Sequence, residues 1–486
     1  MTAQFNRRKF LKTIGIGAGS LYTLGCGSQQ TSETSKRLPN IIFILVDDMR
    51  YDQLSLTGHP FARTPNLDRI GREGVNFRNA FVCTPLCSPS RASFLTGQYP
   101  HKHRIINNDR NGLSFISHKL VTFPQLLRRR GYQTAFIGKW HMGDDDTRRP
   151  GFDHWISFRA QGLFIDPVIN VNGQRRQYSG YITDMLNQWA VEFVQKKHDR
   201  PFLLYLSHKA VHQPYIPAAR HQNLYADKKY TPPPSANDNL EGKPALRRKV
   251  PPVDKLRIPG ATPEPAEPRY GRGTSRNDIF LDHLRCLASV DEGVGMLFDV
   301  LERTGQLDNT LIIFSSDNGY LFGEHGLFQN KRVAYEESLR VPLLMRFPKL
   351  IEPGSERDQL VLNIDIVPTL YDLAGVEAPI TLHGKSLLPV IEDAGAPLRD
   401  AFLAEYFLEK IDPLYAEWQA VRSRRWKYIH YRELVGMDEL YDLQSDPHEM
   451  NNLINSPGHQ RTLRKMQQKL RQLLAVSETP SNLLFL

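Results

Sequence analysis

The stretch NIIFILVDD, residues 40–48, decides the fold of this chain. Its continuous apolar run from Ile41 to Val46 ends in two acids, Asp47 and Asp48. Unbroken apolar strands are typical of parallel sheets, because helices cover both faces of such sheets. The stretch therefore predicts a central, fully buried strand with a pair of aspartates at its carboxyl end.

Three further apolar runs resemble the first: YQTAFIGKWH (132–141), RPFLLYLSHKAVH (200–212) and NTLIIFSSDNG (309–319). They alternate with helical patterns, one at 123–130 closed by Gly131 and one from Phe280 to Leu301 closed by Gly305. Strands that alternate with helices predict an α/β fold, a large mixed and mostly parallel sheet sandwiched by helices.

A smaller C-terminal α+β domain is predicted to follow the sheet. WQAVRSRRWKYIHY (418–431) indicates a strand pair, and 459–475 has apolar residues at helical spacing. The expected organisation is an export signal (1–26), a polar tether (27–37), a catalytic domain (38–398) and the C-terminal domain (399–486). Residues 231–268 hold 10 of the 33 prolines, which predicts a long loop that overhangs the cleft.

Polar residues with chemical capability follow each of the four runs. They are Asp47 and Asp48, Lys139 and His141, His208 and His212, and Asp317 and Asn318. In open α/β sheets, ligands bind at the carboxyl edge of the strands. Either acidic pair alone would be read as a turn former, but the two pairs together favour a shared metal. Three carboxylates and an amide oxygen select Ca²⁺ or Mg²⁺ over Zn²⁺.

The segment CSPSRASFLTG, residues 87–97, predicts a helix with Pro89 in its first turn and Gly97 at its end. Cys87 is then at the helix N-terminus, with Arg91 on the same face, a setting that predicts an acidic and reactive thiol. A hard cation prefers oxygen to sulfur. Cys87 is therefore either no ligand of that metal or does not remain a cysteine.

Composition limits the classes of function. The chain has 486 residues, 40% hydrophobic and 23% charged, which suits a soluble globular protein. Its net charge of +10 includes four cations of the leader, so the remaining excess is modest; it suits anionic substrates and gives no reason to expect nucleic acid. Four cysteines make no disulfide framework, and Cys83 and Cys286 are interpreted as small buried hydrophobes.

The first residues are predicted to be an export signal. Paired arginines, Arg7 and Arg8, precede a Gly-rich apolar stretch that resembles a twin-arginine export signal and is too short to span a bilayer. Cys26 closes the stretch as the lipid-acceptor cysteine of a bacterial lipoprotein would, although Thr23 stands where such signals usually carry leucine. The expected location is the periplasm, or the cell envelope of a bacterium with Cys26 as lipid anchor.

These residues carry a resemblance to a known family. CSPSR followed by ASFLTG resembles the signature of the formylglycine-dependent (type I) sulfatases, which have an alkaline phosphatase-like fold. The resemblance extends through PNIIFILVDD, TFPQLLRRRGYQTAFIGKWH, FLLYLSHKAVHQP, TLIIFSSDNG, KRVAYEESLRVPLL and ELYDLQSDPHEMNNL. It implies hydrolysis of sulfate esters, and a cysteine that is oxidised to formylglycine (3-oxoalanine), whose hydrate supplies oxygens to Ca²⁺.

The resemblance also implies roles for individual residues. Asp47, Asp48, Asp317 and Asn318 would bind Ca²⁺ together with residue 87, and Arg91 would hold the formylglycine hydrate. Lys139 and Lys331 would contact sulfate oxygens, His141 would orient the hydrate or the sulfate, and His212 would protonate the leaving alcohol. His208 is the weaker candidate for the proton donor. One hydroxyl of the hydrate would attack sulfur, and the other would lose its proton to expel sulfate.

The implied partners are a sulfated carbohydrate and a maturation enzyme, either a formylglycine-generating or an anaerobic sulfatase-maturing one. SDNGYLFGEHGLFQNKRVAYEESLRVPLL and YPHKHRIINND resemble most the branch that includes N-acetylglucosamine-6-sulfatases, which favours 6-O-sulfate of N-acetylglucosamine. Other sugar or aryl sulfates, a formylglycine-dependent phosphonate monoester hydrolase and a glycan-binding pseudoenzyme stay open as alternatives.

Overall fold

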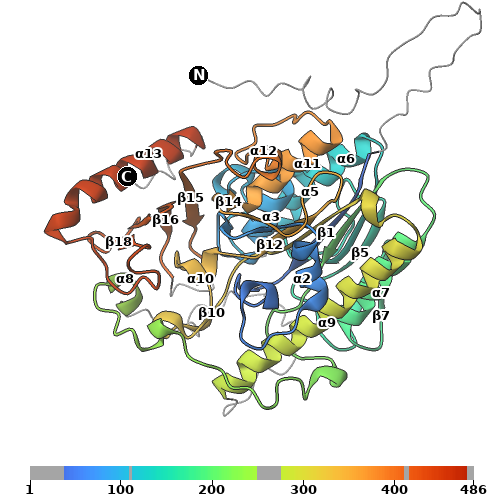
Figure 1. Cartoon of the computed structure of the whole chain (residues 1–486), viewed down its shortest axis with the longest axis horizontal. Coiled ribbons are helices and arrows are strands. Elements are labelled where there is room, and N and C mark those ends of the chain that lie inside the picture. The colour runs from blue at the N-terminus through green and yellow to red at the C-terminus, as the bar shows by residue number, and fades with distance from the viewer. Residues whose placement is uncertain (1–37, 109–111, 249–274, 410–414, 479–486) are drawn as a thin grey trace, which may run out of the picture. The chain divides into compact units, whose positions relative to one another are not determined.

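The structure of the protein is a computed structural model, and it describes residues 38–108, 112–248, 275–409 and 415–478 (Figure 1). Residues Leu38–Leu486 form one compact unit. The predicted export signal, the tether, Cys26 and residues 249–268 of the Pro-rich segment lie outside the described residues.

The main sheet has ten strands within the described residues. In spatial order they are β13 (Ser355–Arg357), β2 (Val75–Phe77), β12 (Leu343–Arg346), β9 (Thr310–Ser316), β1 (Asn40–Val46), β8 (Phe202–Ser207), β4 (Gln133–Lys139), β5 (His154–Phe158), β6 (Val168–Val171) and β7 (Gln174–Gln177). The block β9–β1–β8–β4–β5 is parallel throughout, and β12, β6 and β7 add antiparallel pairs at its two sides. The four predicted strands are therefore adjacent, with β1 between β9 and β8.

Alternate side chains of β1 enter two different cores. Ile41, Phe43 and Leu45 pack on one face, and Ile42, Ile44 and Val46 pack on the other. Every one of these six is at most 1% exposed, which is why the run contains no polar residue.

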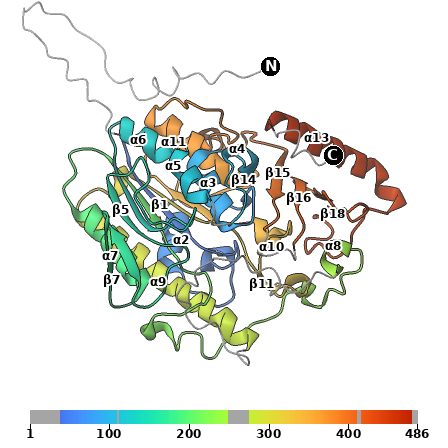
Figure 2. The same ribbon diagram turned by 180° about the vertical axis from the view of Figure 1, so that it is seen from behind.

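Helices cover both faces and make a three-layer sandwich. One core includes residues of α3 (Cys87–Thr96), α6 (Phe123–Arg129) and α11 (Ile366–Ala374), and the other includes residues of α2 (Pro65–Arg72), α7 (Ile182–Gln195) and α9 (Arg276–Arg303). Figures 1 and 2 show the two helical layers on opposite sides of the sheet. The shorter helices are α4 (Pro100–His103), α5 (Leu113–Lys119), α8 (Pro244–Arg247), α10 (Glu336–Leu339) and α12 (Leu388–Glu392).

The C-terminal part contains a second, antiparallel sheet and a helix. The sheet is β15 (Ala401–Tyr406), β16 (Trp418–Ser423), β17 (Trp426–Tyr431) and β18 (Glu439–Asp442), and α13 (Gln460–Val476) packs on it. The predicted strand pair is β16–β17, and Met466 and Leu470 of the predicted terminal helix are buried. The predicted fold class is confirmed, whereas the boundary at 398/399 stays a prediction. Two small ladders, β10 (Leu321–Phe322) with β11 (Phe328–Asn330) and β14 (Val361–Leu362) with β3 (Ala80–Phe81), complete the strands.

None of the helices in the described part of the chain combines the length and apolar character that a bilayer span requires.

The described half of the predicted Pro-rich loop contains two short helices, η3 (Pro234–Asn237) and α8. Asp238 between them pairs with Lys243 at 2.9 Å and with His325 at 2.7 Å, and the second pair ties this segment to η6 (Glu324–Gly326), which connects β10 and β11.

Candidate active site

The carboxyl ends of the parallel strands bring the predicted acids together. The Asp317 N–H donates to the carbonyl of Val46 at 3.0 Å, and the Asp48 N–H donates to Asp317 Oδ1 at 3.1 Å. Asp47, in turn, donates its N–H to the carbonyl of Ala210 at 3.0 Å. The three carboxylates are at most 1% exposed, so their mutual repulsion is not screened by water.

Helix α3 places residue 87 against these acids. Cys87 is the first residue of the helix, which ends at Gly97 with φ +69° as predicted. The Cys87 Sγ is 3.5 Å from Asp47 Oδ1 and 2.8 Å from Lys331 Nζ, and the residue is fully buried. Both acidic pairs, which are far apart in the sequence, therefore meet one helix N-terminus.

The predicted acidity of the Cys87 thiol is wrong. Burial, and next the charge of Asp47, raise the pKa of the thiol well above its usual value and outweigh Lys331 and Lys139. Arg91 does not offset this, because its guanidinium is turned toward the aspartates. A helix N-terminus alone is too weak to ionise a thiol that is out of contact with water and beside a carboxylate.

Three buried cations balance the three carboxylates. Arg91 donates Nε to Asp317 Oδ2 at 2.8 Å and Nη1 to Ser207 Oγ at 2.7 Å. Lys139 donates to Asp47, and Lys331 donates to Asp48 and is 3.4 Å from the amide oxygen of Asn318. Each of the three cations therefore contacts a different aspartate of the cluster most closely, and Lys331 also contacts Cys87.

The acids respond to this environment in different ways. Burial opposes the ionisation of Asp47, but Lys139 and the other cations together hold its pKa well below the usual value. Burial and the neighbouring Asp47 raise the pKa of Asp317 to about 7. The carboxylates therefore compete for positive charge, which is the behaviour expected of a site that takes up a cation.

The donor atoms fit a hard metal ion. One ligand atom from each of Asp47, Asp48, Cys87 and Asp317 lies within 4.8 Å of all the others. Asp48 Oδ2 is buried and has no hydrogen-bond partner among the described residues, so one carboxylate oxygen is left to bind an ion. Asn318, which donates its amide to Asp48 at 2.6 Å, adds an oxygen to the same cluster. The oxygens suit Ca²⁺, and the sulfur of an unmodified Cys87 does not.

His212 also lies close to residue 87, since one of its ring nitrogens, Cys87 Sγ and an oxygen of Asp47 all lie within 4.8 Å of one another. His212 Nε2 is 3.7 Å from Asp48 Oδ2, and its Nδ1 is 2.6 Å from the carbonyl of Gln213. Burial lowers the pKa of both His212 and His208 to about 3. Both ring nitrogens of His208 lack hydrogen-bond partners among the described residues, so its role stays a prediction.

Gln161 was not predicted, although it joins two predicted residues. Its side-chain oxygen accepts from Lys139 Nζ, and its amide nitrogen is 3.0 Å from His141 Nε2. Lys139 ends β4, whereas His141 lies beyond the strand with φ +58°, so the two residues do not share one strand and Gln161 is what joins them. Gln161 follows β5, the next parallel strand, and the rule of the carboxyl edge applied to that strand would have found it.

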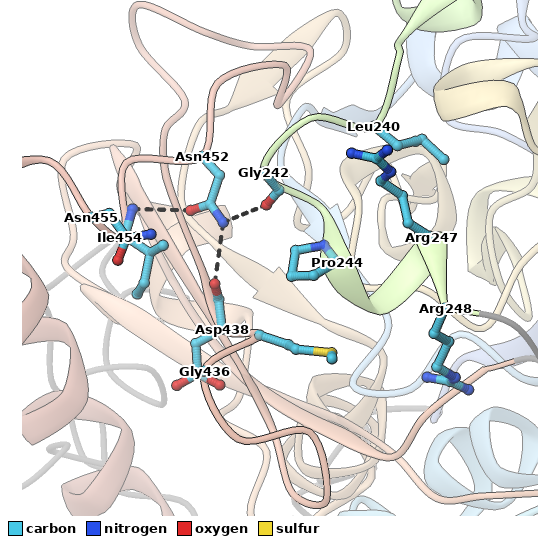
Figure 3. A pocket seen from close by; sticks show the side chains of 11 residues that line it. Leu240, Gly242, Pro244, Arg247, Arg248, Gly436, Asp438, Asn452, Ile454 and Asn455 are labelled. Carbon is cyan, nitrogen blue, oxygen red and sulfur yellow. Dashed lines mark hydrogen bonds between the residues drawn. The ribbon is translucent and has the colours of Figure 1, made fainter.

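A separate pocket lies between α8 and the C-terminal sheet (Figure 3). Asn452 closes one side by donating to the carbonyls of Gly242 at 2.7 Å and Asp438 at 3.1 Å. None of the predicted site residues lines it, so the chemistry is assigned to the edge of the main sheet.

Two protein-family profiles match this chain. The sulfatase family profile matches residues 39–376, and the profile described as N-sulphoglucosamine sulphohydrolase, C-terminal, matches residues 323–476. The chain belongs to the sulfatase family. This sulfatase is a sulfuric ester hydrolase on the alkaline phosphatase-like fold.

Individual relatives of this sulfatase have different substrates. The N-acetylglucosamine-6-O-sulfatase of Bacteroides thetaiotaomicron is 32% identical over 95% of this chain and 90% of its own. A solved structure of a protein in complex with its substrate D-glucosamine-2-N,6-O-disulfate is 31% identical, with a TM-score of 0.81, and covers 92% of this chain and 99% of its own. The choline-sulfatase of Rhizobium meliloti is 31% identical over 86% of this chain and 80% of its own. Identity at this level therefore fixes the reaction and leaves the alcohol open.

Proposed function

We propose that this sulfatase removes the 6-O-sulfate of N-acetylglucosamine from sulfated glycans, with a formylglycine made from Cys87 and with Ca²⁺. The observation that carries the proposal is the meeting of three carboxylates and three cations around residue 87. The sugar is supported by the relative that acts on N-acetylglucosamine-6-sulfate and by the structure that binds a 6-O-sulfated glucosamine.

The charge balance of the site favours a bound anion. Arg91, Lys139 and Lys331 offset the three aspartates, so a divalent cation would give the site an excess of positive charge. Asp47, Asp48, Asp317 and Asn318 would hold that Ca²⁺, which supplies a Lewis acid to polarise sulfate oxygens. Lys139 and Lys331 would turn from the acids to the sulfate and stabilise the charge that builds up on its oxygens during S–O cleavage.

Residue 87 would supply the nucleophile as formylglycine, whose hydrate offers an oxygen where the thiol offers only sulfur. The unmodified thiol is protonated, buried and beside Asp47, and so cannot attack a sulfate ester. Cys87 is 0% exposed, so the formylglycine-generating or anaerobic sulfatase-maturing enzyme would have to reach it before the fold closes.

His212 would deliver the proton to the leaving alcohol. With Nδ1–H held by the Gln213 carbonyl, its Nε2 faces the site. Burial outweighs the attraction of Asp47 and lowers the pKa of His212 to about 3, so the ring is neutral at pH 7 before a substrate binds. A bound sulfate ester adds negative charge close to the ring, which raises this pKa and allows Nε2 to carry the proton.

The proposed location is outside the cytoplasm, in the periplasm or anchored to the cell envelope through Cys26. The paired arginines and the apolar stretch that ends at Cys26 support this proposal. Fractionation of cells that produce the full chain tests it, and mass spectrometry of the mature N-terminus distinguishes a lipidated Cys26 from a free one.

A panel of defined substrates tests the function. It contains N-acetylglucosamine-6-sulfate, N-sulfoglucosamine, iduronate-2-sulfate, galactose sulfates, an aryl sulfate and choline sulfate, with phosphate and phosphonate monoesters as controls. We expect N-acetylglucosamine-6-sulfate to have the highest kcat/KM, because a site built on polar contacts to sugar hydroxyls discriminates between positional isomers. Preference for another sulfate would overturn the assigned sugar alone, and turnover of only the phosphorus esters would overturn the sulfatase reaction.

A further inference from the structure

A buried carboxylate of the C-terminal part reaches toward the reaction centre. Glu409 follows β15 and is 0% exposed. Its Oε1 accepts the Asn108 N–H at 3.0 Å, and its Oε2 accepts from Arg332 Nε. The two oxygens therefore bind two segments that are more than two hundred residues apart in the sequence.

The first segment leads to residue 87. Asn108 Oδ1 accepts the N–H of Ser88 at 3.0 Å and so caps the N-terminus of α3, directly beside Cys87. The Ser88 hydroxyl donates to the carbonyl of His141. A shift of Asn108 would therefore move both residue 87 and His141.

The second segment leads to Lys331. Arg332 has φ +79°, a backbone conformation that a residue with a side chain adopts only when its surroundings hold it there. Glu409 holds its side chain, and Trp418 Nε1 of β16 donates to its carbonyl at 2.8 Å. Lys331, the residue before Arg332, is again in contact with residue 87, because its Nζ is 2.8 Å from Cys87 Sγ. The contacts close a ring that runs Cys87–Ser88–Asn108–Glu409–Arg332–Lys331–Cys87.

We propose that Glu409 is a positioning residue for sulfate ester hydrolysis, which fixes residue 87 and Lys331 relative to each other from the C-terminal sheet. The inference rests on the proposed roles of those two residues, and Glu409 itself touches neither of them. A carboxylate suits this task because its two oxygens accept at once from a backbone N–H and from a guanidinium. The nucleophile and a sulfate-binding cation must be held to a fraction of an ångström, since a 1 Å misplacement costs about a hundredfold in rate.

The variant Glu409→Gln tests the proposal against a matched control, Glu405→Gln. Glu405 is also 0% exposed and lies within β15, but it pairs with His101 at 2.9 Å, and within the described part of the chain it has no hydrogen bond to a residue of the ring. We expect both variants to lose stability, while only Glu409→Gln lowers kcat, by about tenfold or more, with a KM change of less than about threefold. The formylglycine content at residue 87 should equal that of the wild type. An equal kcat loss in the two variants, or a kcat for Glu409→Gln within about twofold of wild type, would overturn the proposal.

Two further measurements keep the test independent of folding and of turnover. Asn108→Ala breaks the same ring without removing a charge, and it should lower kcat in the same direction with little change in Tm; an unchanged kcat counts against the ring. A crystal structure of Glu409→Gln should show Arg332 out of positive φ and Lys331 Nζ away from residue 87. If that crystal structure shows the wild-type arrangement, the positioning role of Glu409 is wrong, whether or not the wild type cleaves a sulfate ester. If the wild type cleaves no sulfate ester, only the proposed function is wrong.

Discussion

At the scale of single residues, Cys87 and its surroundings are mismatched. The thiol lies 3.5 Å from Asp47 Oδ1 and 2.8 Å from Lys331 Nζ, beside carboxylates that suit a hard cation, yet sulfur is the wrong donor for such an ion. Burial adds to the mismatch, because it keeps the thiol protonated. An oxygen-bearing residue at position 87 removes both difficulties.

The first prediction concerns Asp317 and the metal. Ca²⁺ at a hundredfold excess over its Kd should stabilise the fold by ~2.7 kcal/mol, because it binds only the assembled carboxylates. Chelation should therefore lower both Tm and the hydrolysis rate of the wild type, and Asp317→Ala should lose the response to Ca²⁺. Asp308→Ala is the control, since Asp308 is an exposed acid near the other end of β9.

Titration of Ca²⁺ into metal-free protein, followed by Tm, is the measurement. The metal assignment is wrong if chelation of the wild type changes neither Tm nor rate, or if Asp317→Ala keeps the same shift as Asp308→Ala.

At the scale of elements, the continuous apolar runs identify the strands because burial on both faces favours apolar residues at successive positions. The same property identifies the site, since the first polar residues after β1 and β9 are Asp47 and Asp317. The helix that starts at Cys87 follows from Pro89 and Gly97, whose effects are local. These features could be predicted without knowing the tertiary structure.

Other contacts depend on tertiary structure and have no local signal. Glu409 lies in a loop, and nothing in its neighbours along the chain shows that it approaches Arg332. Gln161 can be found only by applying the carboxyl-edge rule to β5 as well. The acidity of Cys87 was mispredicted for the same reason, because a helix terminus can be read from sequence and the depth of burial cannot.

The ends of helices give a second prediction. Gly97 and Gly305 both end a helix with positive φ, +69° and +64°. An added Cβ at Gly97 would be 3.0 Å from Val367 Cβ and 3.2 Å from Leu382 Cδ2, whereas Gly305 faces open space. Both substitutions by alanine should cost about 1 kcal/mol from the left-handed backbone, and Gly97→Ala should cost more because its neighbours must move.

Urea unfolding of Gly97→Ala and Gly305→Ala measures the difference. Equal losses in the free energy of unfolding would show that the space behind α3 is looser than the contacts indicate.

At the scale of the whole molecule, the main sheet and the C-terminal sheet are joined by buried charges as well as by apolar packing. Lys427 of β17 pairs with Glu449 at 2.7 Å and with Glu336 of α10 at 2.9 Å. His101 of α4 pairs with Glu405 of β15 at 2.9 Å and is 2.9 Å from the Ser477 carbonyl that follows α13. These pairs therefore connect the C-terminal sheet to α10 and to α4, the short helix that follows α3.

The His101–Glu405 pair predicts a pH dependence of stability. Burial opposes the charge of His101, but Glu405 outweighs it and raises the pKa of the imidazole above its usual value. The pair's stabilisation is then fully present below the unfolded-state pKa of about 6.5 and is lost as pH rises through the folded-state pKa. The Tm loss of His101→Gln should be larger at about pH 6 than at about pH 9.

His103→Gln serves as the control, because burial lowers the pKa of His103 to about 3 and the ring stays neutral over that range. Its Tm loss should have the opposite pH dependence and be smaller at about pH 6 than at about pH 9, because below about pH 6.5 unfolding lets the ring take up a proton. A Tm loss for His101→Gln that does not become larger toward pH 6 would contradict a charged His101–Glu405 pair.

The claim on which the account depends is that residue 87 works as an oxygen-bearing residue and not as a thiol. Mass spectrometry of the peptide that contains residue 87, taken from active enzyme, tests it most directly. We expect an aldehyde or its hydrate in place of the thiol. Between preparations, kcat should rise in proportion to the fraction of residue 87 that is modified. Full turnover by protein whose Cys87 is an intact thiol would contradict it.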